Sequence, residues 1–354
     1  MKKIVLAFFM VFFINQAHAS VSSIMIDAQS GDVLSSSNAD ELRYPASLTK
    51  LMTLYITFDA LEKGLIKKTD MLKVSWTASN RSPSRLGLRA GETISVEDCI
   101  NALIVKSAND VATVLAENIG YNEQNFAKTM TEVAHALGMK NTTFKNASGL
   151  PNKAQKTTAR DMALLGAAMY HHFPQYYTLF SQRSFKYKGY THWTHNHLLR
   201  NFDGADGMKT GYTRASGFNI VTSAQKDGKR VIAVTMGHKT ADKRDNKIAS
   251  LMNSGLEIKD DGSKDYGIQV GAFTNYAKAR QYANAVNNLI KKKDVKVDVD
   301  VVETASTVMY RSQIIGFAKK DAHNTCNYLK KSKKSCIVIS HKETKEMKLA
   351  YHDK

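Results

Sequence analysis

The sequence predicts an α+β protein with two domains: an antiparallel sheet covered by helices, followed by a small βαββαβ unit. Strand patterns occur near residue 22 and again after about residue 191, and helical patterns fill most of the chain between them. This order is typical of a mixed fold in which helices cover an antiparallel sheet. The length of 354 residues also favours two domains. A polar, charged stretch at 257–265, EIKDDGSKD, is the predicted linker.

The elements of the first domain, expected at 20–256, follow from local patterns. Residues 22–34 alternate around a Gly-Asp turn, which indicates two paired strands. A run that begins near Ser47 is apolar on nearly all sides, so it is expected to be a buried helix with Gly64 as its C-cap. The residues at 217–237 alternate around Lys-Asp-Gly-Lys and indicate a hairpin. Further helices are expected at 96–107, 109–120, 122–137 and 159–171.

The second domain, expected at 266–342, shows a different alternation. YGIQVGAF, VKVDVDVVET, VMYRSQIIGF and CIVISH have strand patterns, and helical patterns follow the first and the third of them. This order is the split βαβ arrangement. A polar tail at 343–354 has no strong apolar face, so membrane attachment through a C-terminal helix is not expected.

The first 19 residues have the pattern of an export signal. Lys2 and Lys3 precede an apolar stretch of 11 residues, and Ala17 and Ala19 supply the small residues of a cleavage site. The stretch is too short to span a bilayer comfortably, and no later segment is apolar over about 18 residues. We therefore expect a secreted, periplasmic protein that starts at Ser20 and has no transmembrane helix in its mature chain.

The net charge of +18 favours polyanionic partners. An exported protein seldom meets nucleic acid, so nucleic acid is not an expected partner, and anionic membrane surfaces or acidic wall polymers fit better. A high lysine content without a functional meaning explains the charge equally well.

The three cysteines suggest a single disulfide. Cys326 and Cys336 are close together near the end of an exported chain, and a bridge between them is expected to tie a helix to the last strand. The alternative is two separate buried thiols. Cys99 lies in an apolar helical pattern and is predicted to be a buried free thiol. No zinc signature accompanies these cysteines, and neither a metal nor a cofactor is expected.

A group of histidines at 192, 195 and 197 lacks a carboxylate or cysteine companion. We interpret it as a wet loop or the rim of a substrate cleft in preference to a metal site.

A serine and a lysine, Ser47 and Lys50, stand three residues apart where the buried helix begins. Taken alone, the pair is explained by a helix N-cap and a solvated lysine. A second copy, Ser223 and Lys226, lies in the predicted hairpin and is assigned no role.

Two further motifs change the interpretation of the first copy. Ser107-Ala108-Asn109 lies at the junction between two predicted helices, and Lys209-Thr210-Gly211 precedes the predicted hairpin. The three motifs in this order are similar to those of penicillin-binding proteins and class A β-lactamases.

The chemistry of these residues fits nucleophilic catalysis. Ser47 would lie near the positive end of the helix dipole, and Lys50 one turn on would reach its hydroxyl. Lys50 can act as the base if burial and a positive neighbour such as Lys209 lower its pKa. The backbone N–H groups of Ser47 and of a residue near Tyr212 would form the oxyanion hole.

The other motif residues would bind and orient the substrate. Ser107 would pass a proton to the leaving amine, and Asn109 would hold Lys50 and the substrate amide. The hydroxyl of Thr210 would contact a substrate carboxylate, and Gly211 would let the strand backbone approach closely.

Five stretches resemble the serine-type D-alanyl-D-alanine carboxypeptidases, the low-molecular-mass penicillin-binding proteins of the S11 peptidase group. They are PASLTKLMT, SANDVATVLAE, NTTFKNASGLPN, TTARDMALL and GADGMKTGYT, and the resemblance covers about residues 22–256. It implies a β-lactamase/transpeptidase-like fold and removal of the terminal D-alanine from peptidoglycan stem pentapeptides. It also implies an acyl-enzyme on Ser47, where β-lactams would bind too. Family members often carry histidine where this chain has Ser148.

The second domain resembles a SPOR domain, most clearly in YGIQVGAFTNYAKARQYAN. The resemblance implies a ferredoxin-like fold whose sheet face binds glycan strands stripped of stem peptides, which concentrates such proteins at the division septum. It implies that Gln269 and Gln313 face that groove. The alternative is a domain for packing or dimerisation.

Three other activities remain open to different degrees. β-Lactam hydrolysis would begin with the same acylation, but no clear Glu-x-x-Leu-Asn segment for deacylation is present. Endopeptidase action on cross-links requires the same residues, and the sequence does not separate it from carboxypeptidase action. The third hypothesis is a wall-binding protein whose catalytic domain is inactive. The presence of all three catalytic motifs argues against this hypothesis.

Overall fold

The computed structural model describes residues 20–81, 83–226, 228–256, 264, 266–291, 294–303 and 308–340. The predicted export signal, the predicted linker apart from residue 264, and the predicted polar tail lie outside the described residues. Among the described residues, no helix combines the length and the apolar character that crossing a bilayer requires.

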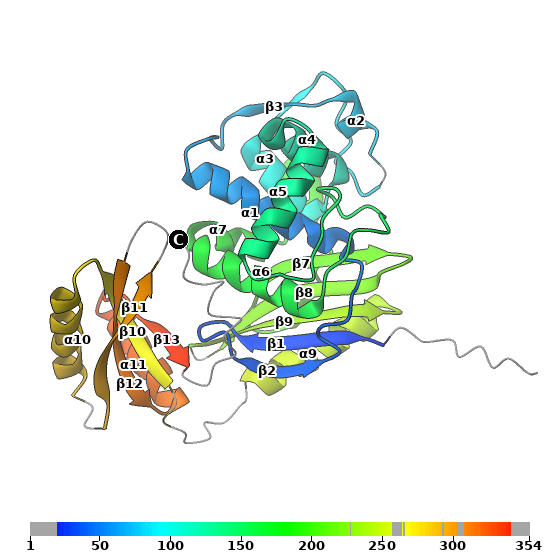
Figure 1. The fold of residues 1–354 in the computed structure, drawn as a ribbon. Coiled ribbons are helices and arrows are strands. Elements are labelled where there is room, and N and C mark those ends of the chain that lie inside the picture. The colour runs from blue at the N-terminus through cyan, green and yellow to red at the C-terminus, as the bar shows by residue number, and fades with distance from the viewer. Residues whose placement is uncertain are drawn as a thin grey trace, which may run out of the picture.

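A five-stranded sheet forms the centre of the first domain (Figure 1). Its order is β2-β1-β9-β8-β7, and every neighbouring pair is antiparallel. The first strands of the chain thus lie beside the last strands of the domain, with Ile24 opposite Val234. The strands are β1 (Ser22–Asp27), β2 (Val33–Ser37), β7 (Ala205–Thr213), β8 (Gly217–Lys226) and β9 (Lys229–His238). Both predicted strand pairs are present.

Helices cover both faces of this sheet. In β1, Ile24 and Ile26 belong to the large core beneath the helices of the middle region, whereas Met25 belongs to a smaller core on the other side. This alternation is the two-residue period of a strand that is buried on both faces. The smaller core is closed by α9 (Ala241–Leu256), a helix that the sequence analysis did not predict. Figure 1 shows α9 beneath the sheet and α6 above it.

The central helix of the domain is α1 (Thr49–Glu62), which is buried on nearly every side as predicted. Gly64 follows its end with a φ of +66°, a conformation typical of a residue after a helix C-terminus. The other predicted helices correspond to α3 (Val96–Asn101), α4 (Asn109–Gly120), α5 (Glu123–Ala136) and α6 (Ala159–His172). The short elements are β3 (Met71–Lys73), α2 (Trp76–Ser79), β4 (Thr93–Ser95), α7 (Pro174–Tyr177), β5 (Ser184–Tyr187), β6 (Tyr190–Trp193) and α8 (Leu198–Asn201).

The helix predicted at 96–107 is regular only as far as Asn101. Residues 102–106 continue as a wider π-type turn, and Ser107 then adopts the left-handed conformation with a φ of 59°. Turns of this kind are frequent at functional sites. The irregularity separates α3 from α4 and presents Ser107 at the junction.

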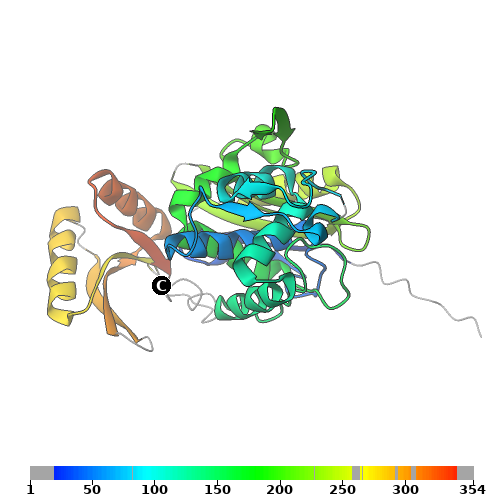
Figure 2. The same cartoon turned by 90° about the horizontal axis from the view of Figure 1, so that it is seen from above.

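The second domain has the predicted βαββαβ order. Its sheet has the order β11-β12-β10-β13, and its two helices lie beside the sheet (Figure 2). The elements are β10 (Tyr266–Phe273), α10 (Tyr276–Ile290), β11 (Lys296–Glu303), β12 (Val308–Phe317), α11 (Lys319–Lys331) and β13 (Ile337–Ser340). Its buried cluster, which includes Ile268, Ile314 and Leu329, shares no residue with the cores of the first domain. Each domain therefore has its own core.

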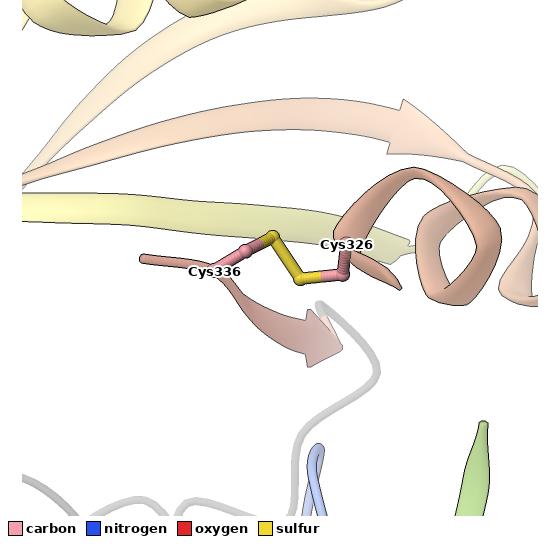
Figure 3. The surroundings of a disulfide bond; sticks show 2 residues. All are labelled: Cys326 and Cys336. Atoms are coloured by element: carbon pink, nitrogen blue, oxygen red, sulfur yellow. A yellow bond between two sulfur atoms is a disulfide. The ribbon is translucent and has the colours of Figure 1, made fainter. Parts of the chain in front are cut away.

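The expected disulfide is present between Cys326 of α11 and Cys336, which precedes β13 (Figure 3). The two Cα atoms are 5.3 Å apart, within the usual range for a bridge. Both residues are buried in the core of the second domain. Cys99 is a buried free thiol, and burial raises its pKa well above the usual value.

We predict that thiol counting will find no reactive thiol in the native protein and one after denaturation without reductant. The native value follows from the burial and raised pKa of Cys99, because the thiolate is the reactive form. The measurement is titration with a chromogenic disulfide before and after addition of guanidinium chloride. A Cys99→Ala variant is the control and should give no thiol in either state. Three thiols in the denatured wild-type protein would contradict the bridge.

Candidate functional site

Ser47 and Lys50 meet at the start of α1. Ser47 lies in a turn of 3-10 helix (Ala46–Leu48), and Lys50 lies in the first turn of α1. The Lys50 Nζ is 3.2 Å from the Ser47 Oγ. Lys50 is 0% exposed, and Ser47 makes no side-chain cap, because the residue before the first helical position is Leu48. The reading of this pair as a cap and a solvated lysine is therefore wrong.

The Lys50 amino group has three oxygen neighbours. Besides Ser47 Oγ, it lies 2.7 Å from Asn109 Oδ1 and 2.5 Å from the backbone oxygen of Ser148. The amide and carbonyl oxygens can only accept, so they take two N–H bonds in either protonation state. A neutral amine keeps one lone pair, and the only neighbour of the three that can donate to it is the Ser47 hydroxyl. The geometry thus directs the lone pair of neutral Lys50 to Ser47.

The environment favours the neutral form of Lys50. Burial lowers the pKa of Lys50 well below its usual value, the charge of Lys209 lowers it further, and Asp110 opposes both effects. Burial acts in this direction because a charged amine loses its hydration in the interior. The contribution of Lys209 agrees with the expectation from the sequence.

The side chain of Asn109 is oriented by a hydrogen bond of its amide nitrogen. Its Nδ2 donates to the Pro83 backbone oxygen at 3.1 Å, which leaves Oδ1 to face Lys50. The neighbouring Asp110 accepts hydrogen bonds from the backbone N–H groups of residues 86–88 and so fixes the segment that carries Pro83. Asn109 is the first residue of α4, so its position follows from the start of that helix.

Ser107 presents a hydroxyl that has no protein partner. Its side chain is nearly buried, and its Oγ finds no hydrogen bond among the residues that the structure describes. A buried hydroxyl without a partner is uncommon and is energetically unfavourable. This oxygen is available to a bound molecule.

Lys209, Thr210 and Gly211 lie on β7, at the edge of the sheet. The Lys209 Nζ donates to the Thr210 backbone oxygen at 2.8 Å, and the described part of the chain contains no ion pair of Lys209 with a carboxylate. Burial lowers the pKa of Lys209 to about 7, with a further contribution from the charge of Arg244. A buried amine without an anionic partner is suited to bind an anion.

Gly211 permits a close contact between β7 and the turn that carries Ser47. A Cβ atom at this position would lie 3.0 Å from the Ser47 backbone nitrogen and 3.1 Å from that of Leu48. Any other residue would push the strand away from the serine, as expected for Gly211 from the sequence. The contact places the Ser47 N–H beside the edge strand.

Three residues that the sequence analysis did not single out support this arrangement. Thr53 donates to the Ala147 backbone oxygen at 2.7 Å, and Glu123 accepts from the Ala147 backbone N–H at 3.1 Å. Together they fix the peptide next to the Ser148 carbonyl. Thr53 lies three residues after Lys50 on the same helix face, a spacing that was visible in the sequence. Arg244 of α9 is buried and acts on Lys209, but no sequence pattern marked it.

The interpretation of the histidine group as a loop or cleft rim stays a prediction. His195 is exposed, and its pKa is lowered by desolvation and then by the charges of Lys209 and Lys106. His192 stacks on Phe185, and the His197 Nδ1 is 3.8 Å from an Asp245 oxygen. The second serine–lysine pair is separate: Ser223 is buried against Tyr177, and Lys226 is exposed.

In the second domain, Gln269 and Gln313 are paired across β10 and β12. Their neighbours Ile268 and Ile314 belong to the core under the helices, so the two glutamines are on the other face of the sheet. Gln269 is half-buried, whereas Gln313 is nearly buried and its Nε2 is 3.4 Å from an Asp300 oxygen. The prediction that both side chains face a glycan-binding groove stays a prediction.

Comparison with known proteins places the two domains in described families. Residues 13–240 match the family of D-alanyl-D-alanine carboxypeptidases, and residues 262–340 match the SPOR domain. D-alanyl-D-alanine carboxypeptidase DacC of Escherichia coli is 39% identical over 242 residues, which cover 66% of this chain and 60% of that protein. The chain thus spans about three fifths of the length of this relative.

Two solved structures have similar folds. Penicillin-binding protein 5 from Haemophilus influenzae has a TM-score of 0.66 and 26% identity, over 84% of this chain and 96% of that one. Penicillin-binding protein D2 from Listeria monocytogenes in a cefotaxime-bound form has a TM-score of 0.61 and 30% identity, over 67% and 96%. The predicted fold class is confirmed.

We predict that a Lys209→Met substitution will raise the pKa of Lys50. The reason is that Lys209 lowers this pKa through charge repulsion, which the neutral methionine removes. The measurement is a pH titration of the Lys50 side chain by NMR on protein labelled at the lysine ε-carbon, assigned with a Lys50→Arg variant. Lys226→Met, which removes an exposed lysine at the end of β8, is the control and should leave the titration unchanged. An unaltered Lys50 pKa in Lys209→Met would show that the two amines do not interact.

Proposed function

The chain belongs to the D-alanyl-D-alanine carboxypeptidase family, and on this basis we propose that it removes the terminal D-alanine from peptidoglycan stem pentapeptides through an acyl-enzyme on Ser47. The observation that carries the proposal is the buried Lys50 amine, whose lone pair the surrounding oxygens leave to Ser47. A serine hydroxyl becomes an effective nucleophile when an adjacent base takes its proton.

In the proposed acylation, five groups act on the substrate or on the transferred proton. The Ser47 Oγ attacks the carbonyl carbon of the scissile bond while its proton passes to Lys50. The developing oxyanion accepts hydrogen bonds from the Ser47 N–H and from an N–H of the edge strand near Tyr212. Removal of one such preorganised donor by mutation typically raises the activation free energy by roughly 3–4 kcal/mol. The proton then moves through Ser107 to the amine of the leaving D-alanine.

Deacylation repeats the sequence with water. Lys50, again neutral, takes a proton from a water molecule that attacks the ester carbonyl, and the proton returns to the Ser47 oxygen as the ester bond breaks. The products are free D-alanine from the first step and a shortened stem peptide from the second. A β-lactam would acylate the same serine, and the cefotaxime-bound form of penicillin-binding protein D2 from Listeria monocytogenes supports binding of a β-lactam.

The carboxylate of the terminal D-alanine is assigned to Lys209, with the Thr210 hydroxyl beside it. Lys209 is buried, has no carboxylate partner in the described residues and lies near the buried cation of Arg244. A bound carboxylate would favour the charged form of Lys209 and offset its burial.

The second domain is proposed to bind denuded glycan strands in the periplasm and to concentrate the enzyme at the division septum. The SPOR match and the helix-free sheet face that carries Gln269 support this role. Binding of the wall would act by raising the local substrate concentration and would leave the chemistry unchanged.

We predict that penicillin will label Ser47. Mass spectrometry of the digested protein should find the adduct on the peptide that contains this residue, and Ser47→Ala should abolish it.

Lys50→Arg keeps the charge but cannot act as a base, because arginine stays protonated. Its labelling rate should fall by about 100-fold or more, the usual contribution of a general base. Labelling of Ser47→Ala, or a near-normal rate in Lys50→Arg, would refute these roles.

We predict that truncation after Leu256 will separate wall binding from catalysis. The two domains have separate cores, so the first should fold alone. D-Alanine release from a soluble pentapeptide should stay within about twofold of the full chain, whereas retention on isolated wall sacculi should drop. Circular dichroism establishes folding of the truncated form. Loss of soluble-peptide activity in a folded truncation would show that the second domain completes the active site.

A further inference from the structure

The chain has two tryptophans, and both of them are on the surface of the first domain. Trp76 of α2 is 74% exposed, and Trp193 of β6 is 59% exposed. Their surroundings differ, because the guanidinium carbon of Arg200 lies 5.7 Å from the centre of the Trp193 ring, and the described residues place no cation over Trp76. An exposed indole held against an arginine combines an apolar ring face with several N–H donors.

The hairpin of β5 and β6 determines which side chains share a face with Trp193. Trp193 is opposite Ser184, and Thr191 is opposite Lys186. Directly opposed residues point to the same face of a hairpin, and the pair between them points to the other face. Phe185 belongs to that intervening pair and is part of the large core. The face that carries Trp193 therefore points away from the domain, and we call it the outer face of the hairpin.

The outer face is cationic. Lys186 and Arg200 are exposed, and neither forms an ion pair within the part of the chain that the structure describes. Ser184 and Thr191 add hydroxyl groups, and the outer face carries no carboxylate of its own. A surface with one aromatic ring and two unpaired cations is suited to an acidic ligand that has apolar ring faces.

The hairpin is attached to two segments of the candidate site. Both of its strands contact the wider turn at 102–106, which leads into Ser107. After β6, the Asn196 Nδ2 is 3.4 Å from the backbone oxygen of Gly207 on β7, two residues before Lys209. The hairpin is therefore held at the end of the site where Lys209 would bind the terminal carboxylate.

We propose that the outer face of the hairpin binds a glycan strand of the wall, separate from the strand whose stem peptide occupies the site. The inference rests on the proposed wall substrate. A stem peptide with its carboxylate at Lys209 ends there, so a ligand on the outer face comes from another strand. The C–H faces of N-acetylated sugars stack on an aromatic ring such as Trp193, and their hydroxyl and acetamido oxygens accept hydrogen bonds from Arg200. Stem peptides make the polymer acidic, which complements the two cations.

The first test measures tryptophan emission of the full chain during addition of tetra-N-acetylchitotetraose, an oligomer of N-acetylglucosamine. The second domain contains no tryptophan, so its own binding of glycan gives no signal. In Trp76→Phe the emission reports Trp193 alone, and it should change saturably with the sugar concentration. In Trp193→Phe, which leaves only Trp76, the emission should stay constant. Arg200→Gln in the Trp76→Phe background should raise the Kd by about threefold, the effect of one lost hydrogen bond.

The second test compares D-alanine release from isolated wall sacculi rich in pentapeptide stems with release from a soluble pentapeptide. The readout is the ratio of the two rates, which does not depend on the amount of active enzyme. Trp193→Ala should lower this ratio by about fivefold, as expected for one lost aromatic contact. The matched control is Trp76→Ala, which removes the other exposed tryptophan and should leave the ratio unchanged.

The outcomes separate the glycan surface from the proposed function. Trp193 emission that does not respond to the sugar up to its solubility limit, or a ratio that Trp193→Ala leaves unchanged, would overturn the glycan surface while the carboxypeptidase activity stands. Emission that responds to phosphatidylglycerol vesicles and not to the sugar would assign the outer face to a membrane and also overturn the proposal. Absence of D-alanine release from both substrates would overturn the proposed function, and the emission titration would still decide whether the sugar binds.

Discussion

The site depends on the complete burial of one amino group, that of Lys50. Three oxygens surround it, and they satisfy the charged form with three N–H bonds and the neutral form with two N–H bonds and one accepted hydrogen bond. The proton can therefore come and go without movement of the surrounding protein. The 3-10 turn before α1, the start of α4 and the loop before Gly149 each contribute one of the oxygens, so the packing of all three is needed to form one base.

The electrostatics of the site are set by a shortage of negative charge. Lys50 and Lys209 are buried and form no ion pair with a carboxylate among the described residues, whereas the buried Arg244 is paired with Asp245. Asp110, which opposes the lowering of the Lys50 pKa, accepts hydrogen bonds from backbone N–H groups. Burial, with a smaller contribution from the charge of Lys209, favours the neutral base, and an incoming carboxylate would give Lys209 an anionic partner. The edge position of β7 complements this arrangement, because the backbone groups that face away from β8 have no strand partner.

The sequence predicted most of the elements and the motif residues, but little of what holds them together. Alternation and helical runs were sufficient for β1, β2, β8 and β9, for α1 and for the elements of the second domain, whereas no alternation pattern predicted β7. Helix α9 was missed although Ile248, Leu251 and Met252 have helical spacing, because the rest of the segment is polar. The Ser148 carbonyl was beyond prediction, since every residue has a backbone oxygen and only the fold determines which one reaches Lys50.

The pairing of β1 with β9 has a consequence for how the protein is made. Thr235 and Ser22 are hydrogen-bonded across a sequence separation of 213 residues. During synthesis the centre of the sheet cannot close until nearly the whole first domain has emerged, and contacts this distant in sequence form slowly. The chain therefore stays unfolded for a long interval after its first strand appears. For the export that the pattern of the first 19 residues predicts, such a late-closing sheet would keep the early segment competent for transport.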